Sequence, residues 1–318
     1  MFKPLLLSSL LATASAATAA EPFSFVLLGD APYGAPEAVY APFRTMIDTI
    51  NAQDPTLVVH VGDTKSGSTP CSDQMLDDQL DFLNSFAAPT LYSPGDNEWT
   101  DCHRAKAGGF DPLERLDYIR NTYYVDPATS FGQAPVEVTH QGDAGYPENT
   151  RLLLNDVMFI TTHVVGSNNN FEIRDPSAVA EFMARDAANL DWLKASFAAA
   201  DNAAAIVLAI HADMFEFGFG TSSNPEAFVR HSGFQNFGSE LVRLANGFGK
   251  PVLLVFGDSH TFRMFRPFPK TSPHVMALET FGSKDMHAVE VTVTPEDAFP
   301  FAIQPLLNPA VPITAPQM

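Results

Sequence analysis

Five hydrophobic runs in this chain are followed by a residue with a carboxylate or an imidazole. The clearest is residues 252–256, which lead into Asp258 and His260. The other four runs lead to Asp30, Asp63, Asp96 and His211. Short apolar runs bounded by turn residues are typical of strands, and ligands bind open α/β sheets at the carboxyl ends of strands. Because carboxylates and imidazoles are metal ligands, the pattern predicts a metal site at one sheet edge.

Helix signals alternate with these strands. We predict helices at residues 39–52, 72–86, 112–121 and 178–200 and a helical region at 225–247. The alternation predicts βαβ units and an α/β fold. Further strands are expected at residues 136–140, 151–154, 157–162, 274–278 and 287–293.

The first residues predict a secretory signal peptide at 1–19. Lys3 supplies the positive start, residues 5–11 an apolar stretch, and residues 17–19 a small-residue cleavage pattern. Cleavage before Ala20 or before Glu21 fits. We therefore expect a secreted or periplasmic protein with one domain at 20–294. A proline-rich tail at 295–318 would wrap the surface or be disordered.

The chain is strongly acidic, with a formal net charge of −19. A field of this sign repels nucleic acids and anionic membranes, so neither is expected as a partner. It also repels phosphate groups unless cations lie in the site.

Two cysteines occur, Cys71 and Cys102. In an exported protein such a pair predicts one disulfide. The bridge would connect the loops that follow Asp63 and Asp96, either as a brace for the site or as a general staple.

In their order along residues 23–260, these motifs resemble the calcineurin-like metallophosphoesterases, which include the purple acid phosphatases. That superfamily has an Asp after the first strand, a Gly-Asp, a Gly-Asn-His-Asp/Glu, a lone His and a Gly-His-x-His. The resemblance implies a four-layer α/β sandwich of two mixed sheets flanked by helices. It also implies a small phosphorylated substrate and two divalent metal ions, which clamp a phosphate.

The resemblance also implies the ligand sets. One metal would take Asp30, Asp63 and His260, and the other would take Asp63, Asp96, His211 and Asp258.

Three departures from the family pattern stand out. A histidine expected two residues after Asp30 is missing, and nearby Tyr33 either substitutes for it or packs in a turn. Asn97 stands where the family has a proton-handling histidine; it can hydrogen-bond a phosphoryl oxygen but cannot transfer a proton. Asp96 and Asp258 replace Asn and His, which favours Mn²⁺, Mg²⁺ or Ca²⁺ and leaves Fe and Zn open.

Other residues on these loops are candidates for catalysis and substrate binding. His103 is the first candidate to protonate the leaving oxygen and Glu98 the second; a solvated loop histidine is the alternative for His103. Lys65 and Arg104 are candidate phosphate contacts. The serine and asparagines at residues 167–170 form a polar turn or line a substrate pocket.

The leading hypothesis is a secreted metal-dependent phosphoesterase that hydrolyses a phosphate monoester or diester with a metal-activated water. Asn97 would bias it toward substrates with good leaving groups. The alternatives are a non-catalytic metal- or phosphate-binding protein on the same fold, or a structural calcium site.

Overall fold

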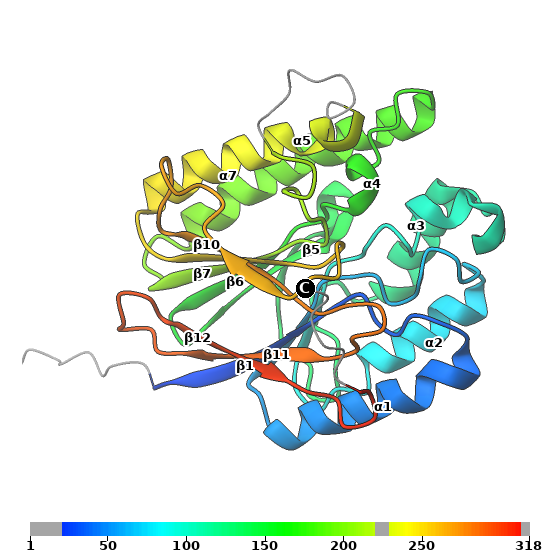
Figure 1. Ribbon diagram of the computed structural model, residues 1–318. Coiled ribbons are helices and arrows are strands. Elements are labelled where there is room, and N and C mark those ends of the chain that lie inside the picture. The colour runs from blue at the N-terminus through cyan, green and yellow to red at the C-terminus, as the bar shows by residue number, and fades with distance from the viewer. Residues whose placement is uncertain (1–20, 220–228, 313–318) are drawn as a thin grey trace, which may run out of the picture.

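The computed structural model describes residues 21–219 and 229–312, which form a sandwich of two mixed β-sheets (Figure 1). The five-stranded sheet contains, in spatial order, β12 (Phe301–Leu306), β11 (Ala288–Val293), β1 (Phe23–Leu28), β2 (Leu57–His60) and β3 (Thr90–Tyr92). The seven-stranded sheet contains β4 (Thr139–Gln141), β5 (Tyr146–Leu154), β6 (Val157–Thr161), β7 (Ala205–Ala209), β8 (Val252–Phe256), β10 (Val275–Glu279) and β9 (Arg263–Phe265).

Each sheet has a parallel centre. Strands β1, β2 and β3 run parallel to one another, as do β6, β7, β8 and β10. The remaining strands pair antiparallel at the margins. Consequently, the parallel strands of each sheet end at the same edge, where the predicted ligands follow them.

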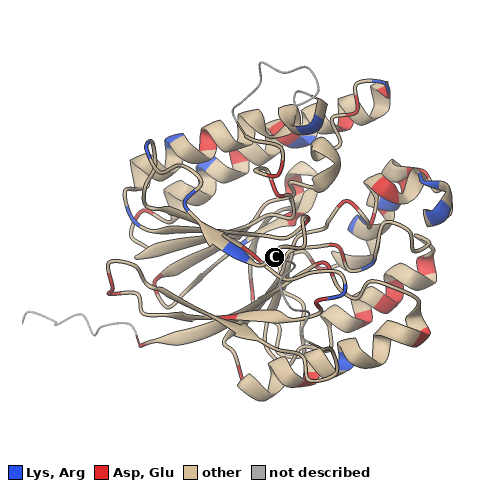
Figure 2. Cartoon of the chain, viewed as in Figure 1, with Lys and Arg blue, Asp and Glu red and all other residues tan. Residues whose placement is uncertain are grey.

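Helices cover both outer faces of the sandwich (Figure 1). They are α1 (Pro36–Gln53), α2 (Asp73–Leu83), α3 (Pro112–Tyr123), α4 (Gly166–Asn169), α5 (Pro176–Ala199) and α7 (Gln235–Phe248). Short 3-10 turns are η1 (Thr100–His103), η2 (Ala105–Ala107), η3 (Gly142–Ala144) and η4 (Ser232–Phe234). Acidic residues are spread over the helices and crowd α2, which carries no basic residue (Figure 2).

Side-chain alternation along the strands divides the core into layers. Phe25 and Leu27 of β1 face the second sheet, whereas Val26 and Leu28 face α1. The second sheet likewise buries its outer face against α5 and α7. Alternate residues of a strand point to opposite faces, so one strand serves both layers. The predicted four-layer α/β sandwich is confirmed.

Local capping explains where three helices begin. Ser72 accepts a hydrogen bond from the Met75 amide at the start of α2. Asp111 and Asp175 cap α3 and α5, each followed by a proline at the first helical position. Such caps satisfy amides that have no partner inside the helix.

Some elements differ from the sequence prediction. Strand β9 was not expected, and β12 lies within the proline-rich segment 295–318, where it pairs with β11. Helix α7 begins only at Gln235, and residues 225–228 of the predicted helical region lie outside the described residues. The predicted signal peptide at 1–19 also lies outside them. None of the helices in 21–219 and 229–312 is long and apolar enough to cross a membrane.

Candidate metal centre

Loops at the carboxyl edges of the two sheets bring five predicted ligands together. Donor atoms of Asp30, Asp63 and His211 lie within 4.8 Å of one another, as do those of Asp96, His211 and Asp258. The two groups share His211. The sixth predicted ligand, His260, lies beside them, with its Nε2 3.6 Å from Asp30 Oδ1.

The backbone is left-handed at four of the six predicted ligands. The φ angles are 51° at Asp30, 55° at Asp63, 77° at Asp258 and 60° at His260. This region is unfavourable for L-residues, although Asp adopts it more readily than most. Such conformations persist only where surrounding structure imposes them, and they cluster at functional sites.

Two glycines allow the carboxylates to approach the neighbouring loops. A Cβ on Gly95 would lie 2.1 Å from Asp63 Oδ1, and one on Gly257 would lie 2.1 Å from Asp30 Oδ2. Gly95, which precedes Asp96, therefore leaves room for the Asp63 carboxylate. Gly257, which precedes Asp258, leaves room for the Asp30 carboxylate.

Replacing Gly257 with alanine is expected to displace the Asp30 carboxylate and lower metal affinity by about 10- to 100-fold, as loss of ligand support does elsewhere. Gly247→Ala is the control, because a Cβ there meets nothing within 4 Å. It lies in α7 and should stabilise the protein by about 0.5–1 kcal/mol. Titration calorimetry and thermal unfolding check both variants; equal metal affinities would contradict the packing argument.

His211 is oriented for ligation. Its Nδ1 lies 2.9 Å from the Val61 carbonyl oxygen, while its Nε2 lies 3.0 Å from Asp96 Oδ1 and 3.3 Å from Asp63 Oδ1. A backbone carbonyl at Nδ1 selects the tautomer that presents the Nε2 lone pair to a metal, an arrangement common at metal-binding histidines.

The electrostatics of the cluster are unfavourable without cations. Burial raises the pKa of Asp30 to about 7 and that of Asp63 and Asp258 well above the usual range. Burial lowers the pKa of His211, but Asp63 and Asp96 together raise it well above its ordinary value. Without cations, these pKa shifts favour protons shared between the carboxylates and the imidazole.

Tyr33 reaches the cluster of candidate ligands. The alternative that its side chain only packs in its own turn is therefore wrong. Its hydroxyl donates a short hydrogen bond to Asp63 Oδ2 and accepts one of 2.7 Å from the Asn97 side-chain amide. The Asn97 amide also donates to Asp63 Oδ2, and the Asn97 backbone N–H donates to Asp63 Oδ1 at 3.0 Å. Tyr33 and Asn97 thus fix the carboxylate orientation of Asp63.

Glu98 holds the two loops to each other and is fully buried. Its carboxylate accepts hydrogen bonds from the backbone amides of Asp63 at 3.2 Å and Gly95 at 3.0 Å and from the Thr64 hydroxyl at 2.7 Å. With its oxygens occupied by loop donors, Glu98 is not presented to a substrate, which argues against the predicted proton-donor role.

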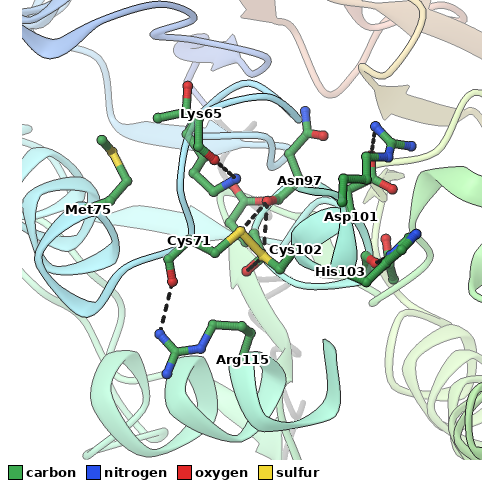
Figure 3. The surroundings of a disulfide bond; sticks show 12 residues. Lys65, Cys71, Met75, Asn97, Asp101, Cys102, His103 and Arg115 are labelled. Carbon is green, nitrogen blue, oxygen red and sulfur yellow. Dashed lines mark hydrogen bonds and ion pairs between the residues drawn. A yellow bond between two sulfur atoms is a disulfide. The ribbon is translucent and has the colours of Figure 1, made fainter. Parts of the chain in front are cut away.

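A disulfide joins Cys71 to Cys102, as predicted, with a Cα–Cα distance of 5.7 Å (Figure 3). Both cysteines are buried, and Arg115 of α3 donates a hydrogen bond of 3.0 Å to the Cys71 carbonyl. Lys65 lies on the same loop, but it is buried and its Nζ donates to the Ser66 and Thr69 carbonyls at 3.3 and 3.2 Å. Its ammonium thus binds its own loop, contrary to the predicted phosphate contact.

Replacing both cysteines with serine is expected to lower the free energy of unfolding by about 3–4 kcal/mol, since the bridge closes a loop spanning 31 positions. Urea unfolding measures the loss. If the bridge also braces the site, metal affinity falls in the same variant; an unchanged metal affinity would make it only a staple.

His103 and Arg104 lie at the wall of a cavity of about 680 Å³ that Asp258 also lines. The Nδ1 of His103 lies 2.6 Å from the Thr100 carbonyl oxygen, and Arg104 pairs with Asp101 at 2.5 Å. Both residues therefore line the same cavity as the candidate ligand Asp258.

The serine and asparagine run forms a left-handed turn at α4. Its four φ angles are 52° at Ser167, 55° at Asn168, 56° at Asn169 and 59° at Asn170. Buried Arg185 holds the turn, because its Nη1 donates a hydrogen bond of 2.6 Å to Asn169 Oδ1. As a result, the Ser167 hydroxyl lies 2.9 Å from Asp96 Oδ2 and 3.1 Å from Asp101 Oδ1.

Arg263 joins a second pair of loops. It forms a short ion pair with Asp213 and one of 2.6 Å with Glu279. Asp213 lies two residues after His211. Glu279 accepts a hydrogen bond of 2.6 Å from the Ser259 hydroxyl. Glu279 ends β10, so the rule that a carboxylate follows a strand could have identified it.

Comparison with known proteins agrees with the fold. The sequence matches no family model and no curated protein. A dimetal phosphatase from Danio rerio aligns with a TM-score of 0.57 at 11% identity, over 91% of this chain and 100% of that chain. A purple acid phosphatase from yellow lupin (Lupinus luteus) seeds aligns with a TM-score of 0.50 at 10% identity, over 94% of this chain and 57% of that one.

These likenesses define the class of fold as a metallophosphoesterase-like α/β sandwich. At 10–11% identity, the fold is what this chain shares with the zebrafish and lupin phosphatases.

Proposed function

We propose that this chain is a metal-dependent phosphoester hydrolase with two divalent ions. One observation carries the proposal: the carboxylates of Asp30, Asp63, Asp96 and Asp258 converge on the buried imidazole of His211. Four carboxylate charges balance two divalent cations. Carboxylates that share a buried site need either cations or protons, and oxygen-rich ligand sets bind Mn²⁺, Mg²⁺ or Ca²⁺ well.

We assign Asp30, Asp63 and His260 to one ion, and Asp63, Asp96, His211 and Asp258 to the other. Two such ions, when bound, neutralise phosphoryl charge and activate a water for attack. The His211 tautomer and the short contacts of Asp63 support this assignment.

The remaining roles concern orientation and proton transfer. Tyr33, Asn97 and Glu98 orient the loops and the Asp63 carboxylate. His103 faces the cavity beside Asp258, so it is the residue that we propose to protonate a leaving oxygen. Asn97 cannot transfer a proton, which favours substrates with good leaving groups.

We also propose that the protein is exported. The signal-like residues 1–19 and the disulfide between Cys71 and Cys102 support this. Sequencing the N-terminus of the protein recovered from its native host tests it: a start at Ala20 or Glu21 is expected, and an intact Met1 would contradict export by cleavage.

The activity is tested with a chromogenic aryl phosphate and the corresponding diester. Chelator-treated protein should hydrolyse neither, and addition of Mn²⁺, Ca²⁺, Mg²⁺, Zn²⁺ or Fe should restore turnover of at least one. Metal binding without turnover of either ester would instead favour a non-catalytic binding protein on the same fold.

A further inference from the structure

The cavity that the candidate ligand Asp258 lines is larger than a phosphate group requires. Its volume is about 680 Å³, and its lining runs from Asp258 and Ser167 outward to the first turns of α3 and α5. Pockets of roughly 300–1,000 Å³ hold whole organic ligands. If the ligand residues take the phosphoryl group, as the proposed function requires, the rest of this space must hold the organic part of the substrate.

Aromatic side chains form part of the wall. Phe171 is stacked on Phe182 of α5, with ring centroids 4.7 Å apart, and Phe234 is buried in the core next to α7. Phe217 is 39% exposed and has the Arg230 guanidinium 4.9 Å above its ring. All but Phe182 line the cavity. Rings that are already fixed by packing provide apolar contact area at little cost in conformational entropy.

The charged part of the wall is acidic. The lining contains seven aspartates and glutamates but three arginines. Arg104 pairs with Asp101 at 2.5 Å, and Arg174 pairs with Glu172 at 2.6 Å. A substrate with a further anionic group would meet net negative charge here and be repelled.

We propose that this cavity selects phosphoesters whose organic group is bulky, aromatic and without negative charge. The proposal rests on the proposed function, because the phosphoryl group must sit at the candidate ligands. It excludes polyphosphates and phosphorylated acids as good substrates.

Binding of phosphonates separates this inference from leaving-group chemistry, since phosphonates are not hydrolysed. Methylphosphonate reports on the metal site alone, naphthylmethylphosphonate adds an uncharged aromatic group, and 4-(phosphonomethyl)benzoate adds an aromatic carboxylate. With metal-loaded protein, calorimetry should give an affinity for the naphthyl compound roughly tenfold or more above that for methylphosphonate. The benzoate should lose most of that advantage.

A matched pair of variants tests the wall. Phe217→Ala should reduce the naphthyl advantage by about fivefold or more, and Phe217→Tyr should retain it. Phe299→Ala is the control, since Phe299 is 40% exposed but lies on the hairpin between β11 and β12. Binding of methylphosphonate should be the same in all of these proteins.

The outcomes are distinguishable. If methylphosphonate does not bind the metal-loaded protein, the proposed function fails and this inference fails with it. If methylphosphonate binds but the naphthyl group adds nothing, or the benzoate binds as tightly as the naphthyl compound, only the inference about the cavity is overturned. A naphthyl advantage that Phe217→Ala leaves intact would likewise overturn it.

Discussion

Replacing Asp63 with asparagine is expected to reduce hydrolysis of an aryl phosphate by at least about 100-fold, because Asp63 is the carboxylate that we assign to both ions. Asparagine keeps the size of the side chain and tolerates the left-handed backbone at φ 55°. The loss would therefore report the missing charge and not a strained loop.

Asp54→Asn is the control for this variant. Asp54 also has a left-handed backbone, with φ 50°, but it is an exposed residue at the end of α1. Its replacement should leave kcat/KM and metal content unchanged. Wild-type activity in Asp63→Asn would remove Asp63 from the catalytic site.

Divalent ions are expected to stabilise the protein more at pH 8 than at pH 5.5. Burial raises the pKa of Asp30 to about 7 in the metal-free fold, from an ordinary value of 3.8. The folded state then holds this proton more tightly than the unfolded chain. Its contribution to stability is therefore full below about pH 4 and is lost as the pH rises through 7.

Bound ions take the place of that proton. They therefore add most to the stability of the fold at pH values where the proton has been lost. With metal at 100 times Kd, the gain at pH 8 is about 2.7 kcal/mol per site, or roughly 5–10 °C in Tm. At pH 5.5 protons compete with the metal ions for the carboxylates, which should at least halve the rise in Tm. Thermal unfolding with and without metal at matched ionic strength measures it. Equal shifts at both pH values would contradict the buried carboxylate cluster, and Asp63→Asn should show a reduced shift at each pH.

The fold could be predicted because its signals are local. Apolar runs such as residues 252–256 are long enough to identify strands, and Asp111-Pro112 marks the start of α3. The ligands could be proposed by the same means, since Asp30, Asp63 and His211 each follow a strand. Parallel strands end at the same edge of the sheet, whatever conformation the loops between them adopt.

The rest of the site depends on contacts between loops that no local pattern specifies. Tyr33 reaches Asp63 only because the first loop folds over the second. Residues 167–170 form a left-handed turn because Arg185, from a different helix, binds Asn169. Glu98 was a candidate proton donor because its acidity is visible in the sequence, while the four loop donors that occupy its carboxylate are not.

The central claim is best tested by the metal content of the purified full chain, measured by elemental mass spectrometry after equilibration with Mn²⁺, Zn²⁺ or Ca²⁺ and removal of free ions. We predict two ions per chain for at least one metal, and no more than one in Asp63→Asn. A wild-type chain that retains no ion of any of these metals would contradict the dinuclear centre.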